Sequence, residues 1–123
     1  MSLDIAAVTF DAENAIELAR FWSAALGRDI DPGPDEQGAY FASIGRSDES
    51  AAGGRPILMF IQVPEGKTAK NRVHLDLDAT DRAAEVERLV GLGATVIHDQ
   101  DEWGTRWTTL ADPEGNEFCV AAH

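Results

Sequence analysis

The feature that most constrains the fold is an internal repeat that spans nearly the whole chain. Residues 10–14, which read FDAEN, open a helical pattern that closes with LG at residues 26–27. Residues 77–81, which read LDATD, open a second pattern that closes with LG at residues 92–93. The copies are offset by 67 residues at the start and 66 at the end, so their register holds within one position. We interpret this pattern as a tandem duplication of one structural unit.

Each copy predicts a strand, a helix and three further strands. Asn14 fits an N-cap with Glu17 three residues later, apolar residues then recur at helical spacing, and Gly27 fits the helix end. The first copy predicts strands at 5–10, 28–31, 40–44 and 57–63; the second predicts strands at 72–78, 95–98, 106–111 and 117–121 and a helix at 82–92. Residues 45–55 predict an exposed loop.

These patterns predict an α+β fold built from two tandem βαβββ modules. Module one covers residues 1–63, the linker covers 64–71, and module two covers 72–123. Neither module covers both faces of its own sheet, so we expect the two sheets to pair around one shared concavity within a single domain.

Composition limits the function classes. A chain of 123 residues with 44% hydrophobic content suits one domain with its own core. The formal net charge of -12 argues against binding to nucleic acid or to an anionic membrane surface. Two interpretations of this charge stay open: it keeps the chain soluble, or it favours cationic ligands at a pocket or its rim. The single cysteine allows no internal disulfide, and the sequence has neither a leader pattern nor a long apolar span, so a cytoplasmic location is expected.

A tight turn precedes a terminal strand with sharp alternation. The turn is predicted at residues 112–116, where proline and glycine fit its corners. In the strand that follows, Phe118 and Val120 point one way, whereas Glu117, Cys119 and Ala121 point the other.

The predicted strand 72–78 alternates in the same manner. Its apolar residues should meet the helices, which sends His74 and Asp76 to the open face together with Glu117 and Cys119. Imidazole, carboxylate and thiol groups on one face suit a divalent metal site or acid-base chemistry, with His74 and Asp76 as the catalytic candidates. Two structural alternatives stay open: His74 as a hydrogen-bonded partner of Asp76, and Cys119 as a small buried hydrophobe.

Two tryptophans predict a ligand contact. Trp103 and Trp107 flank a glycine and Arg106, so they suit stacking on a planar ligand while the guanidinium contacts an anionic group. Phe60, in the predicted strand 57–63, joins these residues as a candidate ligand contact, and so does Cys119. Core packing is the alternative for Trp107.

With the duplication, the VHLD sequence at 73–76 and the DPEGN turn at 112–116, the chain resembles the glyoxalase-like domains of the vicinal oxygen chelate superfamily, which includes glyoxalase I, bleomycin resistance proteins and extradiol dioxygenases. The resemblance implies four metal-ligand positions on the open face. The first falls on Ala7, the fourth strand offers only Gln62, the fifth-strand position is His74, and Cys119 replaces the expected glutamate. A shifted site that uses His74, Asp76 and Glu117 stays open.

The predicted function is therefore small-molecule binding in the concavity without the usual metal site and without a cofactor. Loss of three implied ligands favours a binding protein; retention of His74 beside Asp76 favours the alternative, a metal-dependent lyase or dioxygenase, and a subunit without a ligand of its own stays open. If a divalent metal is present, zinc bound through Cys119 is the expected form. The resemblance also implies a homodimer.

Overall fold

The computed structural model describes residues 2–33, 39–46 and 55–122. The chain forms two compact units, Met1–Gly66 (unit 1) and Lys67–His123 (unit 2). The boundary between them lies within the predicted linker 64–71, and each unit carries one copy of the repeat. Most of the predicted loop 45–55 lies outside the described residues.

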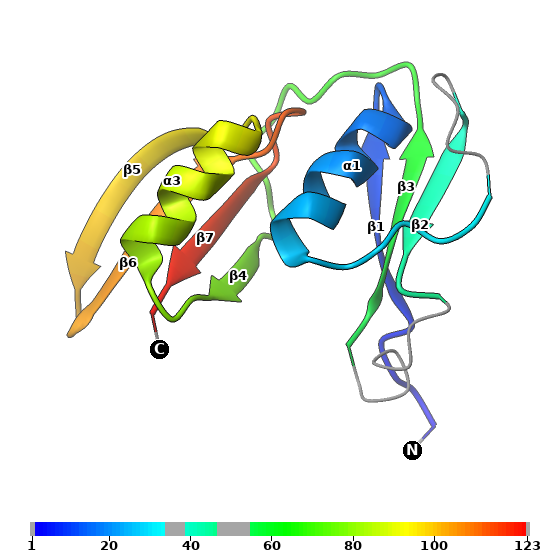
Figure 1. The fold of residues 1–123 in the computed structure, drawn as a ribbon. Coiled ribbons are helices and arrows are strands. Elements are labelled where there is room, and N and C mark those ends of the chain that lie inside the picture. The colour runs from blue at the N-terminus through cyan, green and yellow to red at the C-terminus, as the bar shows by residue number, and fades with distance from the viewer. Residues whose placement is uncertain (1, 34–38, 47–54, 123) are drawn as a thin grey trace. The chain divides into compact units, whose positions relative to one another are not determined.

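Among its described residues, unit 1 contains one helix and a three-stranded sheet (Figure 1). Its elements are β1 (Ala7–Ala12), α1 (Ala15–Leu26), β2 (Phe41–Ile44) and β3 (Ile57–Gln62). The strand order is β1-β3-β2, with β1 parallel and β2 antiparallel to β3. Where the sequence predicts a strand at 28–31, the structure has a single bridge between Ile30 and Ile44.

The core of unit 1 lies between α1 and one face of this sheet. The Asn14 side chain accepts a hydrogen bond from the backbone N–H of Glu17, as predicted for an N-cap. Phe10 stacks on Phe60, with ring centroids 5.2 Å apart, and lies 5.6 Å from the ring of Trp22 on α1. Phe60 is fully buried in this aromatic cluster, so the predicted ligand contact does not fit its position.

Unit 2 completes the predicted βαβββ order. Its elements are β4 (Leu75–Asp78), α3 (Arg82–Leu92), β5 (Thr95–Glu102), β6 (Thr105–Ala111) and β7 (Glu117–Ala121). The strands are ordered β4-β7-β6-β5; β4 is parallel to β7, and the other neighbours are antiparallel. The predicted bounds of α3 and β7 are confirmed.

The first strand of unit 2 begins later than the sequence predicts. β4 starts at Leu75, not at residue 72, and Val73 is 79% exposed. Leu75 pairs with Phe118, and by this register Val73 lies level with residue 116, before β7 begins, so Val73 has no ladder partner in β7. Val73 therefore does not join the helix layer as expected.

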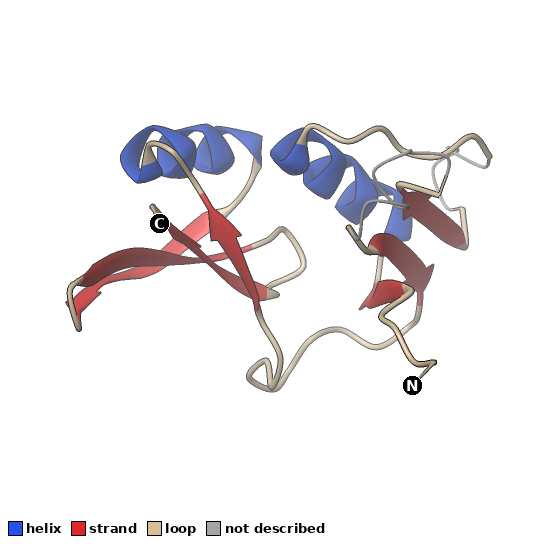
Figure 2. Ribbon diagram, turned by 90° about the horizontal axis from the view of Figure 1, so that it is seen from below, coloured by secondary structure: helices blue, strands red, loops and turns tan. Residues whose placement is uncertain are grey.

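In each unit the helix lies on one face of the strands (Figure 2). In unit 2, the Arg82 guanidinium at the start of α3 donates a hydrogen bond to the Thr108 hydroxyl at 2.7 Å, which fixes the helix side of β6. Phe118 and Val120 are buried, and both lie on the helix side by register with Leu110 and Thr108. The opposite face of the unit 2 sheet, here called the open face, carries the alternate residues.

The turn before β7 is held by one carboxylate. Asp112 is buried, and its Oδ1 accepts hydrogen bonds from the backbone N–H groups of Glu114 and Asn116 at 3.0 and 2.9 Å. Gly115 has φ +89°, the backbone region that the predicted turn requires. The turn thus sets where β7 begins and which of its residues reach the open face. In the described part of the chain, no helix has the length and apolar character needed to cross a membrane.

Candidate functional site

The open face of unit 2 forms a hollow of about 500 Å³. Its walls come from all four strands of this sheet and from the segment that leads into β4. The lining residues are Lys70, His74, Asp76, Leu77, His98, Thr105, Trp107, Thr109, Glu117, Cys119 and Ala121. Cavities that bind small organic molecules have volumes in this range.

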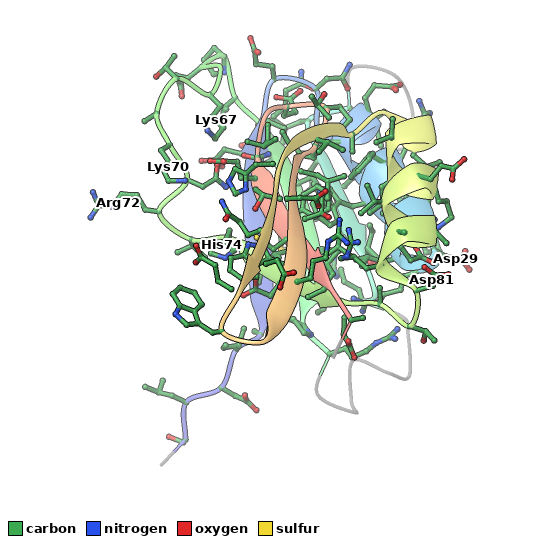
Figure 3. All side chains as sticks on the ribbon, turned by 90° about the vertical axis from the view of Figure 1, so that its left-hand side faces the viewer. Asp29, Lys67, Lys70, Arg72, His74 and Asp81 are labelled. Carbon is green, nitrogen blue, oxygen red and sulfur yellow. The ribbon has the colours of Figure 1, made fainter. Side chains whose placement is uncertain are left out.

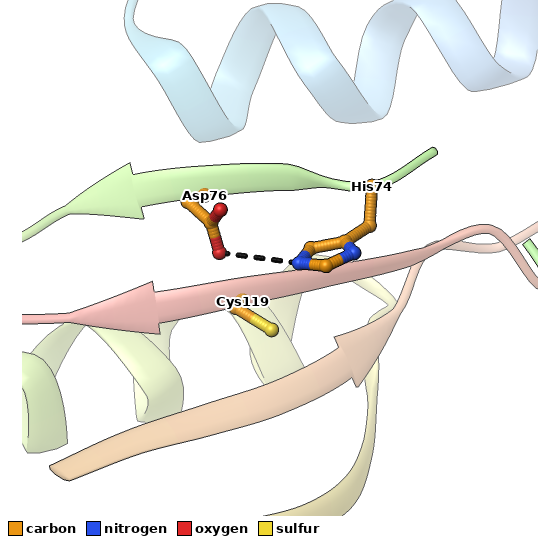
Figure 4. A group of neighbouring side chains, drawn as sticks. All are labelled: His74, Asp76 and Cys119. Atoms are coloured by element: carbon orange, nitrogen blue, oxygen red, sulfur yellow. Dashed lines mark ion pairs between the residues drawn. The ribbon is translucent and has the colours of Figure 1, made fainter. Parts of the chain in front are cut away.

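His74, Asp76 and Cys119 come together on one side of this hollow (Figure 4). Asp76 and Cys119 are register partners on neighbouring parallel strands, so their side chains leave the sheet on the same side. His74 precedes Asp76 by two residues, and its Nε2 lies 3.4 Å from Asp76 Oδ1. One donor atom of each residue lies within 4.8 Å of the other two. Alternation therefore places these three residues as predicted, opposite α3.

The thiol of Cys119 contacts the hydroxyl of Thr109 on the neighbouring strand. The Oγ1 atom of Thr109 lies 3.3 Å from Sγ of Cys119, and the two residues are register partners on β6 and β7. Thr109 is buried, whereas Cys119 is half-buried and lines the hollow. Cys119 is thus a free thiol at the surface of the site, not a core residue.

Glu117 lies on the same face of β7 but not in this cluster. Its Oε1 is 3.3 Å from Nζ of Lys70, in the segment before β4. Figure 3 shows Lys70 and His74 along this segment, with Arg72 pointing away from the sheet. The shifted metal site predicted from His74, Asp76 and Glu117 is not assembled here, because Cys119 and not Glu117 lies beside His74 and Asp76.

Trp103 and Trp107 stack on each other at the β5–β6 hairpin. Their ring centroids are 6.0 Å apart and their planes differ by 12°. Trp107 lines the hollow, and Trp103 is 88% exposed at the hairpin turn. Trp103 has φ +52°, a left-handed conformation that costs a bulky side chain on the order of 1 kcal/mol or more.

Arg106 is not brought together with the two tryptophans. It follows the opposite alternation on β6, and its Nη2 lies 3.7 Å from Oδ2 of Asp99. The sequence predicted a shared ligand contact for Arg106 and Trp107 because the two residues are adjacent along the chain. Adjacent residues in a strand point to opposite faces, so Arg106 does not reach the hollow.

Asp99 belongs to a polar network on the helix side. The Thr108 hydroxyl donates a hydrogen bond to its Oδ1 at 2.5 Å, and this bond is the main cause that holds the pKa of Asp99 below its usual value. Arg82 and Arg106 contribute further by their positive charge. The network ties β5 and β6 to the start of α3 and lies away from the hollow.

His98 reaches the hollow without having been predicted. It pairs with Thr109, and its Nδ1 lies 3.4 Å from the amide nitrogen of Gln100. The register shifts between Val96 and His98, so these residues face opposite sides although they are two positions apart. Strict alternation along β5 would have placed His98 with Val96, and no local sequence signal marks the bulge.

The metal set implied by the resemblance does not fit unit 1. Ala7 offers only a methyl group, on the face of β1 opposite to that of Phe10. Gln62 lies on the helix side, where its Oε1 accepts a hydrogen bond from the backbone N–H of Ala15 at 3.4 Å. Of the four implied positions, the one at His74 alone keeps its usual ligand type. We therefore derive no chemistry through a metal bound in the implied manner.

Comparison with known proteins agrees with this architecture. A family model described as a glyoxalase-like domain matches residues 7–121. An enzyme of the glyoxalase/bleomycin resistance protein/dioxygenase family from Burkholderia phytofirmans PsJN is 17% identical with a TM-score of 0.74, and 98% of each chain is covered. A glyoxalase-related enzyme from Fulvimarina pelagi is also 17% identical, with a TM-score of 0.71 and coverage of 100% of this chain and 89% of that one.

A third structural neighbour is the bleomycin-binding protein from bleomycin-producing Streptomyces verticillus, solved in complex with copper(II)-bleomycin. It is 20% identical with a TM-score of 0.62, and 100% of this chain and 98% of that one are covered. At these identities the likeness shows the fold, and the predicted α+β vicinal oxygen chelate fold is confirmed. No curated protein matches the chain.

Proposed function

Because the chain belongs to the glyoxalase-like domain family, we propose that it binds a small organic molecule in the hollow on the open face of unit 2. Trp107 and Trp103 supply the stacking surface, and the floor is formed by β7. The family's usual metal ligands have no role in this proposal, since Ala7 and Gln62 do not supply them.

The observation that carries the proposal is the stacked tryptophan pair beside the hollow. Trp103 is 88% exposed, so burial of its indole ring contributes little to stability. Its backbone nevertheless adopts a strained left-handed conformation at a two-residue turn. Strain of this kind persists most often where a side chain has a task other than stability. The pair extends the aromatic wall of the hollow from Trp107 outward.

Charge favours a cationic ligand. The formal net charge of -12 raises the local concentration of cations around the chain. In the hollow, Asp76 is mostly exposed, whereas the charge of Glu117 is offset by Lys70. A planar cation would therefore stack on Trp107 and lie near the carboxylate of Asp76.

A structural neighbour gives a precedent for this use of the fold, since it is a bleomycin-binding protein. As part of the proposal, we expect the protein to act in a reducing cytoplasm. Cys119 is a free thiol at the hollow, and such a thiol is kept reduced in that compartment.

The second candidate function is a metal-dependent lyase or dioxygenase. One specific observation favours it: His74, Asp76 and Cys119 bring three donor atoms to one point of the hollow. In this reading His74 is a metal ligand or a base, and Asp76 assists it. The two candidates differ in which side chains the activity needs.

Fluorescence titration of a panel of planar cations tests the proposal. Trp22 is buried in unit 1 and supplies background signal, so quenching by a hit is expected to come from Trp103 and Trp107. Trp107→Ala should weaken binding of a hit by about 1 to 3 kcal/mol, since stacking area is lost. His74→Ala should change the affinity much less. If His74→Ala abolishes turnover of a substrate while Trp107→Ala retains it, the enzyme reading replaces the proposal.

A further inference from the structure

We propose that His74, Asp76 and Cys119 form a three-ligand site for zinc or a similar thiophilic divalent ion, held by unit 2 alone. This site shares the positions of His74 and Cys119 with the metal set implied by the resemblance, but its ligand types differ and it takes no ligand from unit 1. The implied set takes two ligands from each copy of the repeat and includes no thiolate. Here an aspartate and a cysteine join the one retained histidine.

The geometry is close to that of a bound ion. Around a tetrahedral zinc ion with ligands at about 2.0 to 2.3 Å, the ligand atoms lie roughly 3.5 Å from one another. In the structure the three donor atoms lie within 4.8 Å of one another, and His74 Nε2 is 3.4 Å from Asp76 Oδ1. A small adjustment of exposed side chains therefore closes the site.

The backbone fixes the least mobile ligand. Cys119 lies on β7, which is paired with β4 on one side and with β6 on the other. The side chains of His74 and Asp76 are 52% and 69% exposed, so they are free to turn toward the thiol without disturbing the core. Figure 4 shows both projecting from the β4 side toward Cys119.

The chemistry of the ligands selects the metal. A thiolate combined with imidazole and carboxylate suits zinc, whereas magnesium and manganese prefer oxygen ligands. Three protein ligands leave the fourth tetrahedral position open toward the hollow. When the Sγ–metal bond forms, the thiol proton leaves to the buffer.

Thr109 supports the thiolate ligand by contact with its sulfur atom. Its buried hydroxyl is 3.3 Å from Sγ of Cys119, and a metal-bound thiolate accepts hydrogen bonds only. Thr109 must then be the donor, which would orient the sulfur and stabilise its charge.

Cobalt(II) titration of the reduced, tag-free full chain tests the proposal without any organic ligand, so its result is independent of the small-molecule function. We expect one cobalt per chain with a near-ultraviolet thiolate-to-cobalt charge-transfer band, displaced by one equivalent of zinc and not by excess magnesium. Cys119→Ser should abolish the band. His74→Ala and Asp76→Asn should each weaken zinc binding by more than about tenfold, and Thr109→Val by about tenfold.

Glu117→Gln is the matched control. Glu117 lies on the same face of β7 as Cys119 and pairs with Lys70, so its change should leave the affinity within about twofold. Circular dichroism checks that each variant is folded. The proposal is overturned if the reduced protein binds no stoichiometric zinc or cobalt. It is equally overturned if folded Cys119→Ser keeps the wild-type affinity, or if Glu117→Gln loses as much affinity as Asp76→Asn.

Discussion

The indole rings of Trp103 and Trp107 lie nearly parallel, with centroids 6.0 Å apart and planes 12° from each other. Trp107 is fixed by the β6 ladder, whereas Trp103 reaches this position only because its backbone adopts φ +52° at the hairpin turn. The turn residues 103 and 104 both have positive φ, the pattern that asparagine followed by glycine satisfies best. At this hairpin an exposed aromatic ring occupies the first turn position.

Replacing Trp103 separates stability from binding. Trp103→Asn and Trp103→Ala both lose the stack on Trp107, but asparagine tolerates the left-handed conformation better than alanine. We expect Trp103→Asn to be more stable than Trp103→Ala by about 1 kcal/mol in urea denaturation. Both variants should bind a planar cation more weakly than the wild type, to a similar degree. Equal stability of the two variants would show that the backbone of Trp103 is not strained in solution.

Acid should weaken the network around Asp99. The pKa of this carboxyl is lowered in the folded chain, first by the hydrogen bond from Thr108, relative to an ordinary value of 3.8. Its contribution to stability is therefore present above that value and is lost as pH falls through the folded pKa. We expect Asp99→Asn to reduce the loss of stability between about pH 5 and pH 2, as followed by urea midpoints.

Asp101→Asn is the control for this prediction, because it removes an exposed carboxylate from the same strand. It should leave the pH dependence nearly unchanged. Thr108→Val should act like Asp99→Asn, since the valine cannot donate the hydrogen bond. An acid response in Asp99→Asn equal to that of the wild type would contradict the assignment.

The edge strand β5 of the unit 2 sheet favours a homodimer. Within the described sheet β5 pairs with β6 alone, and its residues Val96 and Ile97 are 45% and 46% exposed. The rest of β5 is polar, but an edge strand with exposed apolar residues at one end needs a cover to avoid open-ended association. Sedimentation velocity at about 100 μM should show a dimer, because a standard-sized interface holds at this concentration. Ile97→Lys should shift the chain toward the monomer; a wild-type monomer at this concentration would refute the expectation.

The sequence by itself determined the features that depend on neighbours in the chain. The N-cap Asn14, the bounds of α3 and the turn at Asp112 follow from local hydrogen bonding and backbone preference, and the structure has them as predicted. Alternation along β7 also placed Cys119 on the open face, because the period of a strand is fixed by its backbone. The internal repeat predicted that both units begin with a strand and a helix and continue with further strands.

Tertiary structure decided which of these side chains meet. Register between β4 and β7 set Asp76 opposite Cys119, while Lys70 engaged Glu117. The bulge in β5 turned His98 into the hollow, and the alternation of β6 turned Arg106 away from it.

Burial was decided at the same level. Phe60 is a fully buried core residue, stacked on Phe10, whose ring in turn contacts Trp22. Val73 stayed exposed because β7 begins too late to pair with it. Strand register, bulges and shared packing join residues far apart in sequence, so no local pattern encodes them, and they determine the composition of the site.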